Sequence, residues 1–301
     1  MEVEIDGRVL SLSNLDKVLY PEVGFTKGQV VDYYTRIAPA VLPHLRGRPL
    51  TLKRYPDGVE GEFFYEKQCP AHRPEWVRTA AVHSRSNGRT IDYCLADDLP
   101  TLVWLAQIGD LELHTSLALA RNVKEPTILA FDLDPGPPAT IVECARVALE
   151  LRDLLGRLGL EAFPKTSGSK GMQVYVPLNV PGVSYDDTKT LSRGLAQLLE
   201  RRHPALVVSD MRKTLRAGKV LVDWSQNDEH KTTVSVYSLR ARERPTASTP
   251  LHWEEVEAVL ESGDPEDLAF TSDEVLERYA AEGDLFAPVL ELEQPLPTRV
   301  A

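Results

Sequence analysis

The chain has 301 residues, of which 43% are hydrophobic and 26% charged, a balance that supports a sizeable core and excludes a disordered chain. The N-terminal MEVEIDGRVL has no basic segment followed by an apolar run, and no stretch approaches 18 uncharged apolar residues, so we expect neither a signal peptide nor a membrane span. The three cysteines, Cys69, Cys94 and Cys144, lie far apart in the sequence, which favours reduced thiols in a cytoplasmic protein.

The net charge of −11 is unevenly distributed. Residues 251–301 hold 14 of the 45 acidic residues and 2 of the 34 basic ones, so the first 250 residues hold 31 acidic and 32 basic residues. One basic cluster lies within residues 201–220, and a second lies within residues 46–54. The global charge therefore does not exclude a nucleic-acid partner, which needs only a local cationic surface.

The first 125 residues predict a mixture of helices and strands. The sequence TKGQ at residues 26–29 has the form of a capping box and precedes apolar residues at helical spacing, and Pro39 and Pro43 then break the pattern. Residues 51–67 indicate a strand, a Pro-Asp-Gly turn and an aromatic segment. Residues 95–114 predict an apolar helix followed by a short strand.

After residue 125, predicted strands and helices alternate. ILAFDLD predicts a strand, the TIVE capping box at residues 140–143 begins a helix, and KTSGSKG is a loop before the strand MQVYVPL. A helix over 186–202 and the strands ALVVS, KVLVDW and KTTVSVYSL follow. Helices near 253–262 and 272–281 precede a frayed end, PLPTRVA. The alternation indicates an α/β or α+β fold.

Two carboxylates close the strand ILAFDLDPG. Side chains alternate along a strand, so Asp132 and Asp134 point to one face while the residues between and before them point into the core. Neighbouring carboxylates repel each other, and a divalent cation such as Mg²⁺ or Mn²⁺ compensates that repulsion. The strand KVLVDWSQN delivers a third acid, Asp223, near its end. Three acids on neighbouring strands can hold two metal ions about 4 Å apart for phosphoryl transfer.

The loop KTSGSKG, residues 165–171, has the composition of a phosphate-binding segment. Its glycines permit close backbone approach, its hydroxyls can donate hydrogen bonds, and Lys170 adds positive charge, although the loop is not a Walker A motif. Each feature alone also fits an ordinary structural role: exposed acids at a strand end, a polar loop, a salt-bridged Asp223, or a core or capping His114. Cys69 and His72 have C-x-x-H spacing but lack the second pair of ligands of a structural zinc site.

Eight stretches occur together in the order of a known family: LSNLDKVLYP, FTKGQVVDYY, GEFFYEK, LVWLAQIGDLELH, FDLDPG, KTSGSKG, TLRAGKVLVDWSQN and KTTVSVYSLR. Over roughly residues 10–290 the chain resembles the polymerase module of bacterial ligase D, a member of the archaeo-eukaryotic primase superfamily, and its standalone relatives. The resemblance implies an α+β (mixed α/β) fold in which a central catalytic, RRM-like β-sheet is flanked by helices and an N-terminal α/β subdomain. It implies one domain over 1–301: a part for DNA ends and 5′-phosphates (1–125), a catalytic sheet with the metal site (126–250) and an acidic helical part (251–301).

The resemblance also implies an activity. Such a domain is a nucleotidyltransferase, a template-directed polymerase that uses two Mn²⁺ or Mg²⁺ ions to add NTPs or dNTPs, with a preference for ribonucleotides, to primer 3′ ends. Its DNA partner has a gap or a broken end, preferably with a 5′-phosphate on the downstream strand. A DNA ligase and an end-binding protein such as bacterial Ku are further expected partners. The activity serves gap filling or end extension in DNA repair, either non-homologous end joining or excision gap repair.

The resemblance assigns a role to each candidate residue. Asp132, Asp134 and Asp223 match the catalytic metal-binding triad, with the first two binding both ions. The DNA-binding residues are Lys17 and Lys27 at the 5′-phosphate and Phe63 and Phe64 at the nucleobases. The nucleotide-binding residues are Lys53, His114, Ser167, Ser169, Lys170, Gln173, Arg216, Gln226 and Arg240.

One position departs from the family pattern. Family members commonly have histidine in the strand after the glycine-rich loop, where this chain has Gln173. A glutamine amide can hydrogen-bond a phosphate oxygen, but it cannot become cationic or shuttle a proton. Two other classes of protein fit the same residues. A non-catalytic module that bridges DNA ends for a ligase would leave the three acids idle, and a metal-dependent phosphodiesterase would leave the loop cations without a triphosphate.

Overall fold

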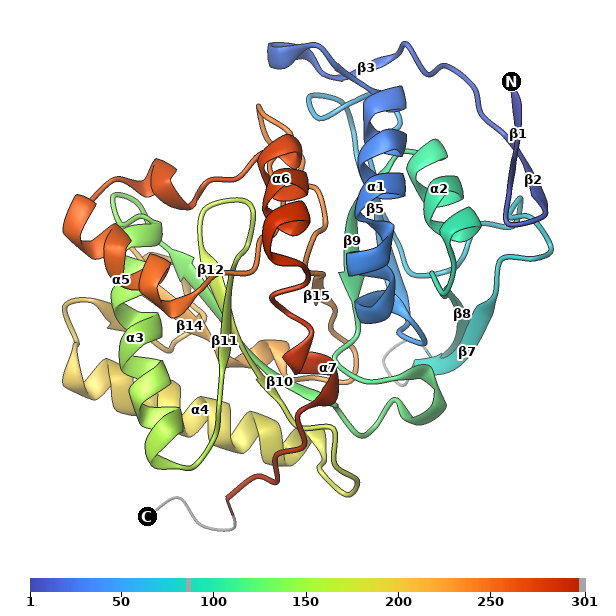
Figure 1. The fold of residues 1–301 in the computed structure, drawn as a ribbon. Helices are drawn as coiled ribbons and strands as arrows, with labels where there is room; N and C mark the ends of the chain where they lie inside the picture. The colour runs from blue at the N-terminus through green and yellow to red at the C-terminus, as the bar shows by residue number, and fades with distance from the viewer. Residues whose placement is uncertain (85–87, 298–301) are drawn as a thin grey trace. The chain divides into compact units, whose positions relative to one another are not determined.

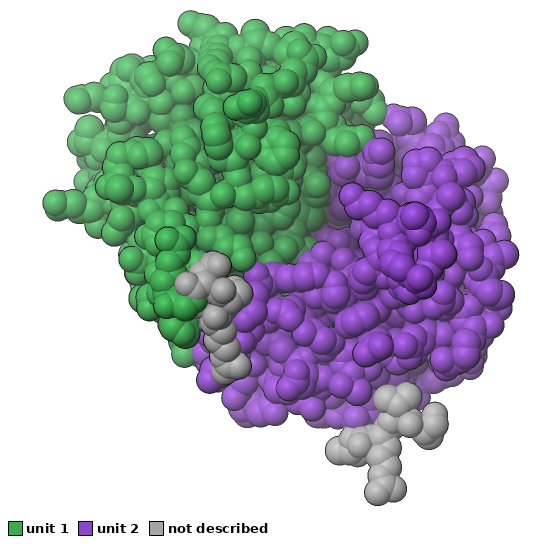
Figure 2. Space-filling model, turned by 180° about the vertical axis from the view of Figure 1, so that it is seen from behind, with its two compact units in different colours: residues 1–121, 232–248, 270–284 green, residues 122–231, 249–269, 285–301 purple. Residues whose placement is uncertain are grey.

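The computed structural model describes residues 1–84 and 88–297 of the chain. It divides into two compact units, coloured separately in Figure 2. Unit 1 comprises residues 1–121, 232–248 and 270–284, and unit 2 comprises residues 122–231, 249–269 and 285–301. Each unit is thus assembled from segments that are distant in the sequence. The division into three consecutive functional parts stays a prediction.

Within the described residues, unit 1 is built on a six-stranded sheet of order β15-β9-β5-β8-β7, with β6 paired to β5 outside this path (Figure 1). The strands of this sheet are β5 (Leu50–Arg54), β6 (Phe64–Glu66), β7 (Thr79–Ser84), β8 (Arg89–Cys94), β9 (Asp110–Thr115) and β15 (Thr233–Val234). Two small hairpins precede it: β1 (Glu2–Ile5) with β2 (Arg8–Ser11), and β3 (Val18–Tyr20) with β4 (Phe25–Thr26). The helices are α1 (Lys27–Leu45), α2 (Leu99–Gln107) and α6 (Ser272–Glu282).

Helix α1 begins where the capping-box pattern predicts. The Thr26 hydroxyl accepts the N–H of Gln29, and the Gln29 side chain accepts the N–H of Thr26. The breaks expected at Pro39 and Pro43 do not occur, because α1 continues through both residues. A proline inside a helix removes one backbone hydrogen bond. Here α1 packs against α2 and α6, and this burial of apolar side chains outweighs the loss.

Unit 2 contains a five-stranded sheet of order β11-β12-β10-β14-β13 in its described part. Its strands are β10 (Ile128–Pro135), β11 (Phe163–Thr166), β12 (Met172–Pro177), β13 (Val207–Val208) and β14 (Val220–Asp223). Its helices are α3 (Ile141–Arg157), α4 (Tyr185–Arg202), α5 (Trp253–Ser262) and the short α7 (Pro288–Glu291). Helices α3 and α4 contact each other and β10, and so cover one face of the sheet (Figure 1). Phe131 and Leu133 of β10 have no exposed surface.

The predicted helices of unit 2 are confirmed, but two of the predicted strands are shorter than expected. Within ALVVS only Val207 and Val208 form a strand, and within KTTVSVYSL only Thr233 and Val234 do. The rest of KTTVSVYSL is loop that pairs through single backbone contacts, such as the bridge between Leu239 and Ala247. No helix in the described ranges is both long and apolar enough to cross a membrane. The last four residues of the predicted frayed end lie outside the described residues.

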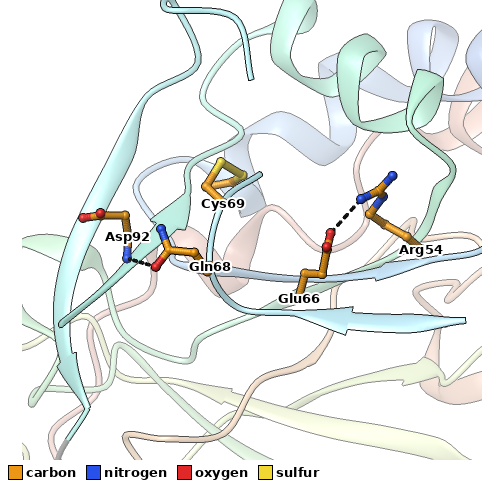
Figure 3. Close-up of a disulfide and its surroundings, with 6 residues drawn as sticks. Arg54, Glu66, Gln68, Cys69 and Asp92 are labelled. Carbon is orange, nitrogen blue, oxygen red and sulfur yellow. Dashed lines mark hydrogen bonds and ion pairs between the residues drawn. A yellow bond between two sulfur atoms is a disulfide. The ribbon is translucent and has the colours of Figure 1, made fainter. Parts of the chain in front are cut away.

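The expectation of reduced cysteines is wrong for two of the three. Cys69 and Cys94 form a disulfide, with their Cα atoms 4.9 Å apart, whereas Cys144 is a buried free thiol (Figure 3). Strand β8 returns alongside the segment after β6, where the Cys69 N–H donates to the Asp92 carbonyl at 2.7 Å and the Asp92 N–H to the Gln68 side chain at 3.2 Å. Distance along the sequence did not indicate this proximity, because strand pairing creates it.

Candidate active site

Polar residues form one row across the sheet of unit 2. The antiparallel register pairs Lys165 of β11 with Gln173 of β12. It also pairs Asp132 of β10 with Gln173 on one side and with Asp223 of β14 on the other. Because directly paired residues project to the same face of a sheet, these side chains share a face, and Asp134 joins them two residues farther along β10. The three carboxylates therefore lie on one face, at neighbouring positions of two central strands.

The carboxyl group of Asp132 is strongly perturbed. Burial, together with the charges of Asp134 and Asp223, raises the pKa of Asp132 from 3.8 to about 7. The Gln173 amide donates to Asp132 Oδ1 at 3.0 Å and lowers this pKa, as does the buried Lys165, but neither outweighs the increase. A cluster of carboxylates with this excess of negative charge fits a hard divalent cation, which takes oxygen ligands.

Asp223 is held by the turn that follows β14. Its Oδ1 accepts the N–H and the hydroxyl of Ser225 at 2.8 and 2.6 Å, and its Oδ2 accepts the Gln226 amide at 3.2 Å. As placed, no three His, Cys, Asp or Glu side chains of the described chain are grouped so that they could hold one metal ion. The register thus brings the three aspartates to one face without gathering their oxygens at one point.

The loop 167–171 lies against the end of β10. A Cβ atom on Gly171 would be 2.1 Å from the carbonyl oxygen of Leu133, so only glycine allows this approach. The Ser167 hydroxyl accepts the N–H groups of Ser169 and Gly171, each at 3.2 Å. Ser169 and Lys170 are exposed. The loop therefore uses Ser167 to keep its shape and presents Ser169 and Lys170 to solvent.

The segment that contains Arg216 packs against Gly136, the residue that follows β10. A Cβ atom on Gly136 would be 1.9 Å from the Arg216 carbonyl oxygen, and the Gly218 N–H donates to the Gly136 carbonyl at 3.0 Å. The Arg216 guanidinium donates to the Met211 carbonyl at 2.7 Å. Because Gly171 and Gly136 lack side chains, the loop and the Arg216 segment can both pack against the strand that carries the paired acids.

In unit 1, three candidate cationic or imidazole side chains meet at one buried carboxylate, that of Glu112. Lys53 Nζ lies 3.1 Å from Glu112 Oε1, while His114 Nε2 and Arg240 Nε lie 3.0 and 3.4 Å from Glu112 Oε2. Lys53 Nζ also lies 4.8 Å from the centre of the Phe63 ring. The structure therefore brings together four of the residues that the resemblance assigns to nucleotide and template.

The aromatic segment at β6 presents large exposed rings. Phe63 is 49% exposed and Phe64 48% exposed. The Phe63 ring packs edge-on against Tyr65 with a centroid distance of 5.7 Å, and Tyr65 lies 6.2 Å from the His114 ring. Adjacent side chains of a strand point to opposite faces, so Phe64 lies on the other side from this aromatic group. Exposed rings of this kind are suited to stacking on nucleobases.

Lys17 and Lys27 lie close together near the β3–β4 hairpin. The Lys27 N–H donates to the Lys17 carbonyl at 2.8 Å. Lys17 forms an ion pair with Asp57 at 2.7 Å, whereas Lys27 is 8% exposed and donates to the Gln107 carbonyl at 3.1 Å. Burial, followed by the charge of Lys17, lowers the pKa of Lys27. A phosphate dianion would compensate two such neighbouring ammonium groups.

The sequence reasoning missed two residues of these clusters, Glu112 and Lys165. Glu112 stands two residues before His114 in LELH, so strand alternation could have placed both on one face. Lys165 was quoted only as the first residue of the loop motif, but it lies in β11 and is fully buried. No local sequence signal shows that it faces the aspartates, because that position depends on the pairing of β11 with β12.

Known proteins of one family are similar to most of the chain. The family model described as "LigD, primase-polymerase domain" matches residues 26–286. The chain is 44% identical over 301 residues to the multifunctional non-homologous end joining DNA repair protein LigD of Mycobacterium tuberculosis, covering 97% of this chain and 38% of that protein. It is 30% identical over 274 residues to the bifunctional non-homologous end joining protein LigD of Bacillus subtilis, covering 91% of this chain and 43% of that protein.

A solved structure is similar over nearly the whole chain. The polymerase domain from Mycobacterium tuberculosis ligase D, in complex with DNA, has a TM-score of 0.86 and 43% sequence identity, and the match covers 95% of this chain and 99% of that one. Fold and sequence similarity thus define a primase-polymerase domain, a nucleotidyltransferase with the mixed α/β fold that the sequence predicts. The chain belongs to the LigD primase-polymerase domain family. It spans less than half the length of these curated relatives.

Proposed function

We propose that this domain extends primer 3′ ends by template-directed nucleotidyl transfer, with a preference for ribonucleotides, during the filling of short gaps or the extension of broken DNA ends. The observation that carries the proposal is the register of unit 2, which pairs Asp132 with Asp223 and places Asp134 on the same face. The perturbed pKa of Asp132 supports it, because it shows that this face needs compensating positive charge.

The proposed roles of the chain's residues follow from their contacts. Asp132, Asp134 and Asp223 would hold two Mn²⁺ or Mg²⁺ ions, which when bound supply Lewis-acid activation of the 3′-hydroxyl and neutralise phosphate charge. Gln173 orients Asp132 from the neighbouring strand β12, and the charge of Lys165, one strand farther away, favours the ionised form of Asp132. The remaining candidates for nucleotide contacts form two groups: Ser167, Ser169, Lys170, Arg216 and Gln226 in unit 2, and separately Lys53, His114 and Arg240 in unit 1. Gln173 acts through its amide alone, without the charge that a histidine could carry.

Recognition of the DNA is assigned to unit 1. The adjacent Lys17 and Lys27 would bind the 5′-phosphate of the downstream strand, and the exposed rings of Phe63 and Phe64 would contact nucleobases. The DNA in the similar mycobacterial domain structure supports this proposal. The names of the longer relatives support a place in non-homologous end joining. A DNA ligase and a Ku-like end-binding protein are the proposed partners, and the cytoplasm is the proposed location.

Primer extension on a gapped duplex with Mn²⁺ tests the proposal. We expect the wild-type domain to add ribonucleotides faster than deoxyribonucleotides, and Asp132→Ala to abolish addition while leaving DNA binding within about twofold. The matched control is Asp186→Ala, which removes an exposed acid of α4 in the same unit. DNA binding without nucleotide addition by the wild type would instead identify a non-catalytic end-bridging module. Release of nucleotides from the primer would identify a phosphodiesterase.

A further inference from the structure

Both carboxylate oxygens of Glu112 have polar partners, although the side chain is only 2% exposed. Besides its ion pairs, Glu112 Oε1 accepts the backbone N–H of Ala241 at 3.1 Å and the hydroxyl of Tyr55 at 3.3 Å. A buried carboxylate is retained at low energetic cost only when it is both paired and hydrogen-bonded, and Glu112 meets both conditions. It therefore has one well-defined position.

This position joins three separate segments of unit 1. Glu112 and His114 share a face of β9, because they are two residues apart in one strand. The register of β5 with β9 pairs Lys53 directly with Glu112. Arg240 comes from the segment 232–248, which is more than a hundred residues away in the sequence. One carboxylate thus fixes the relative positions of a lysine, a histidine and an arginine.

The charges of the cluster determine the state of His114. Burial alone would raise the pKa of Glu112, but the hydrogen bond with His114 and the charges of Arg240 and Lys53 lower it strongly, so Glu112 is ionised. Burial lowers the pKa of His114, as do the charges of Arg240 and Lys53, and this outweighs the opposite effect of Glu112. A neutral His114 then donates its Nε2–H to Glu112 and keeps Nδ1 as a hydrogen-bond acceptor.

The other neighbours of His114 do not change this assignment. Its partners across the sheet are Thr51 of β5 and Val234 of β15, neither of which is charged. The Tyr65 ring packs edge-on against the imidazole, and burial raises the pKa of the Tyr65 hydroxyl, so this group also stays neutral. Glu112 is consequently the negative charge that His114 contacts directly.

We propose that Glu112 is a positioning residue of the nucleotide site, which fixes the tautomer of His114 and holds Lys53 and Arg240 in place for the incoming nucleotide. The inference rests on the proposed polymerase function and deepens it. Without Glu112, the cations Lys53 and Arg240 lose their shared counter-charge. Lys53 would then retain its contacts with the rings of Tyr55, Phe63 and Tyr65, but these neutral rings do not replace the negative charge of the carboxylate.

The variant Glu112→Gln tests this role, because it keeps the shape of the side chain and removes its charge. The matched control is Glu66→Gln, which removes a partly buried carboxylate of the same sheet that pairs with Arg54 at 2.8 Å. Proton NMR titration, with His114→Asn to assign the signal, should show the pKa of His114 falling by at least about half a unit in Glu112→Gln and staying unchanged in Glu66→Gln. A merely structural role would not change that titration.

Steady-state primer extension provides the functional readout. We expect kcat/KM for the nucleotide to fall at least about tenfold in Glu112→Gln and to stay within about threefold in Glu66→Gln. If Glu112→Gln does not fold, Glu112→Asp replaces it: this variant keeps the charge, so the pKa of His114 should not fall, while the shorter side chain should still lower kcat/KM at least about fivefold.

The outcomes separate this inference from the proposed function. An active wild type overturns the positioning role alone if Glu112→Gln has near-normal kinetics or leaves the pKa of His114 unchanged, or if the fallback variant Glu112→Asp has near-normal kinetics. A wild type that adds no nucleotide would overturn the proposed function, and the positioning role with it.

Discussion

Replacing Asp132 with asparagine should stabilise the domain when divalent ions are absent, and increasingly so as the pH rises. Burial and the charges of Asp134 and Asp223 raise the pKa of Asp132 from 3.8 to about 7. Because the folded-state pKa lies above the unfolded one, ionisation of Asp132 opposes folding. That cost is absent below about pH 4, grows with pH and is complete above about pH 7.

The size of the effect follows from the pKa difference. At 1.36 kcal/mol per pKa unit, the full cost is about 4 kcal/mol, and solvent at this half-buried side chain reduces it to about 2–4 kcal/mol. Asparagine removes the charge and keeps an oxygen that can accept the hydrogen bond of the Gln173 amide. The gain from Asp132→Asn should therefore be about 1–3 kcal/mol larger at pH 8 than at pH 5.

Urea unfolding at pH 5 and pH 8 in the presence of a chelator measures this gain. Asp186→Asn, at an exposed position of α4, is the control and should show no such dependence on pH. Adding Mn²⁺ at pH 8 should stabilise the wild type and have a much smaller effect on Asp132→Asn, because only the native carboxylates bind the ion strongly. A gain that is equal at both pH values, or a loss that grows with pH, would refute the electrostatic reasoning.

Two further predictions concern unit 1. The double variant Cys69→Ala, Cys94→Ala should lower the free energy of unfolding by about 3 kcal/mol, since the disulfide closes a loop with a separation of 25 residues. Identical urea midpoints for the wild type with and without reductant would contradict this prediction. Lys27→Ala should reduce the preference for a 5′-phosphorylated gap by about tenfold and leave extension of a simple primer unchanged. Arg36→Ala, at an exposed position of the same helix, is its control, and equal losses on both substrates would argue against the phosphate role.

Local patterns predicted much of the secondary structure. The capping boxes at Thr26 and Thr140 correctly mark the starts of α1 and α3, because a cap satisfies N–H groups of its own helix and needs no distant partner. The strand ILAFDLD was equally readable, since its apolar run and the carboxylates at its end reflect the two faces of β10. The unbroken helix at Pro39 was not readable, because packing against other helices decides it.

Some of the site residues could be predicted from the sequence, and others could not. The paired acids and the glycine-rich loop were visible in the sequence because their chemistry lies in short segments. The position of Lys165 was not visible, because it depends on the pairing of β11 with β12. The contact of Glu112 with Arg240 was not visible either, because Arg240 lies in a segment beyond residue 231. The disulfide was missed for the same reason, since the sequence separates Cys69 and Cys94 while strand pairing brings them together.

The sequence by itself determined most of the helices, the strands that carry the acids of β10 and β14, and the family to which the ordered motifs point. Those features depend on interactions between residues close in the chain or on short motifs that occur together in a fixed order. The tertiary structure alone decided that Asp132 of β10 pairs with Asp223 of the neighbouring strand β14. It also decided that Glu112 contacts Lys53, His114 and Arg240. Strand register sets these contacts, and register is a property of the whole sheet.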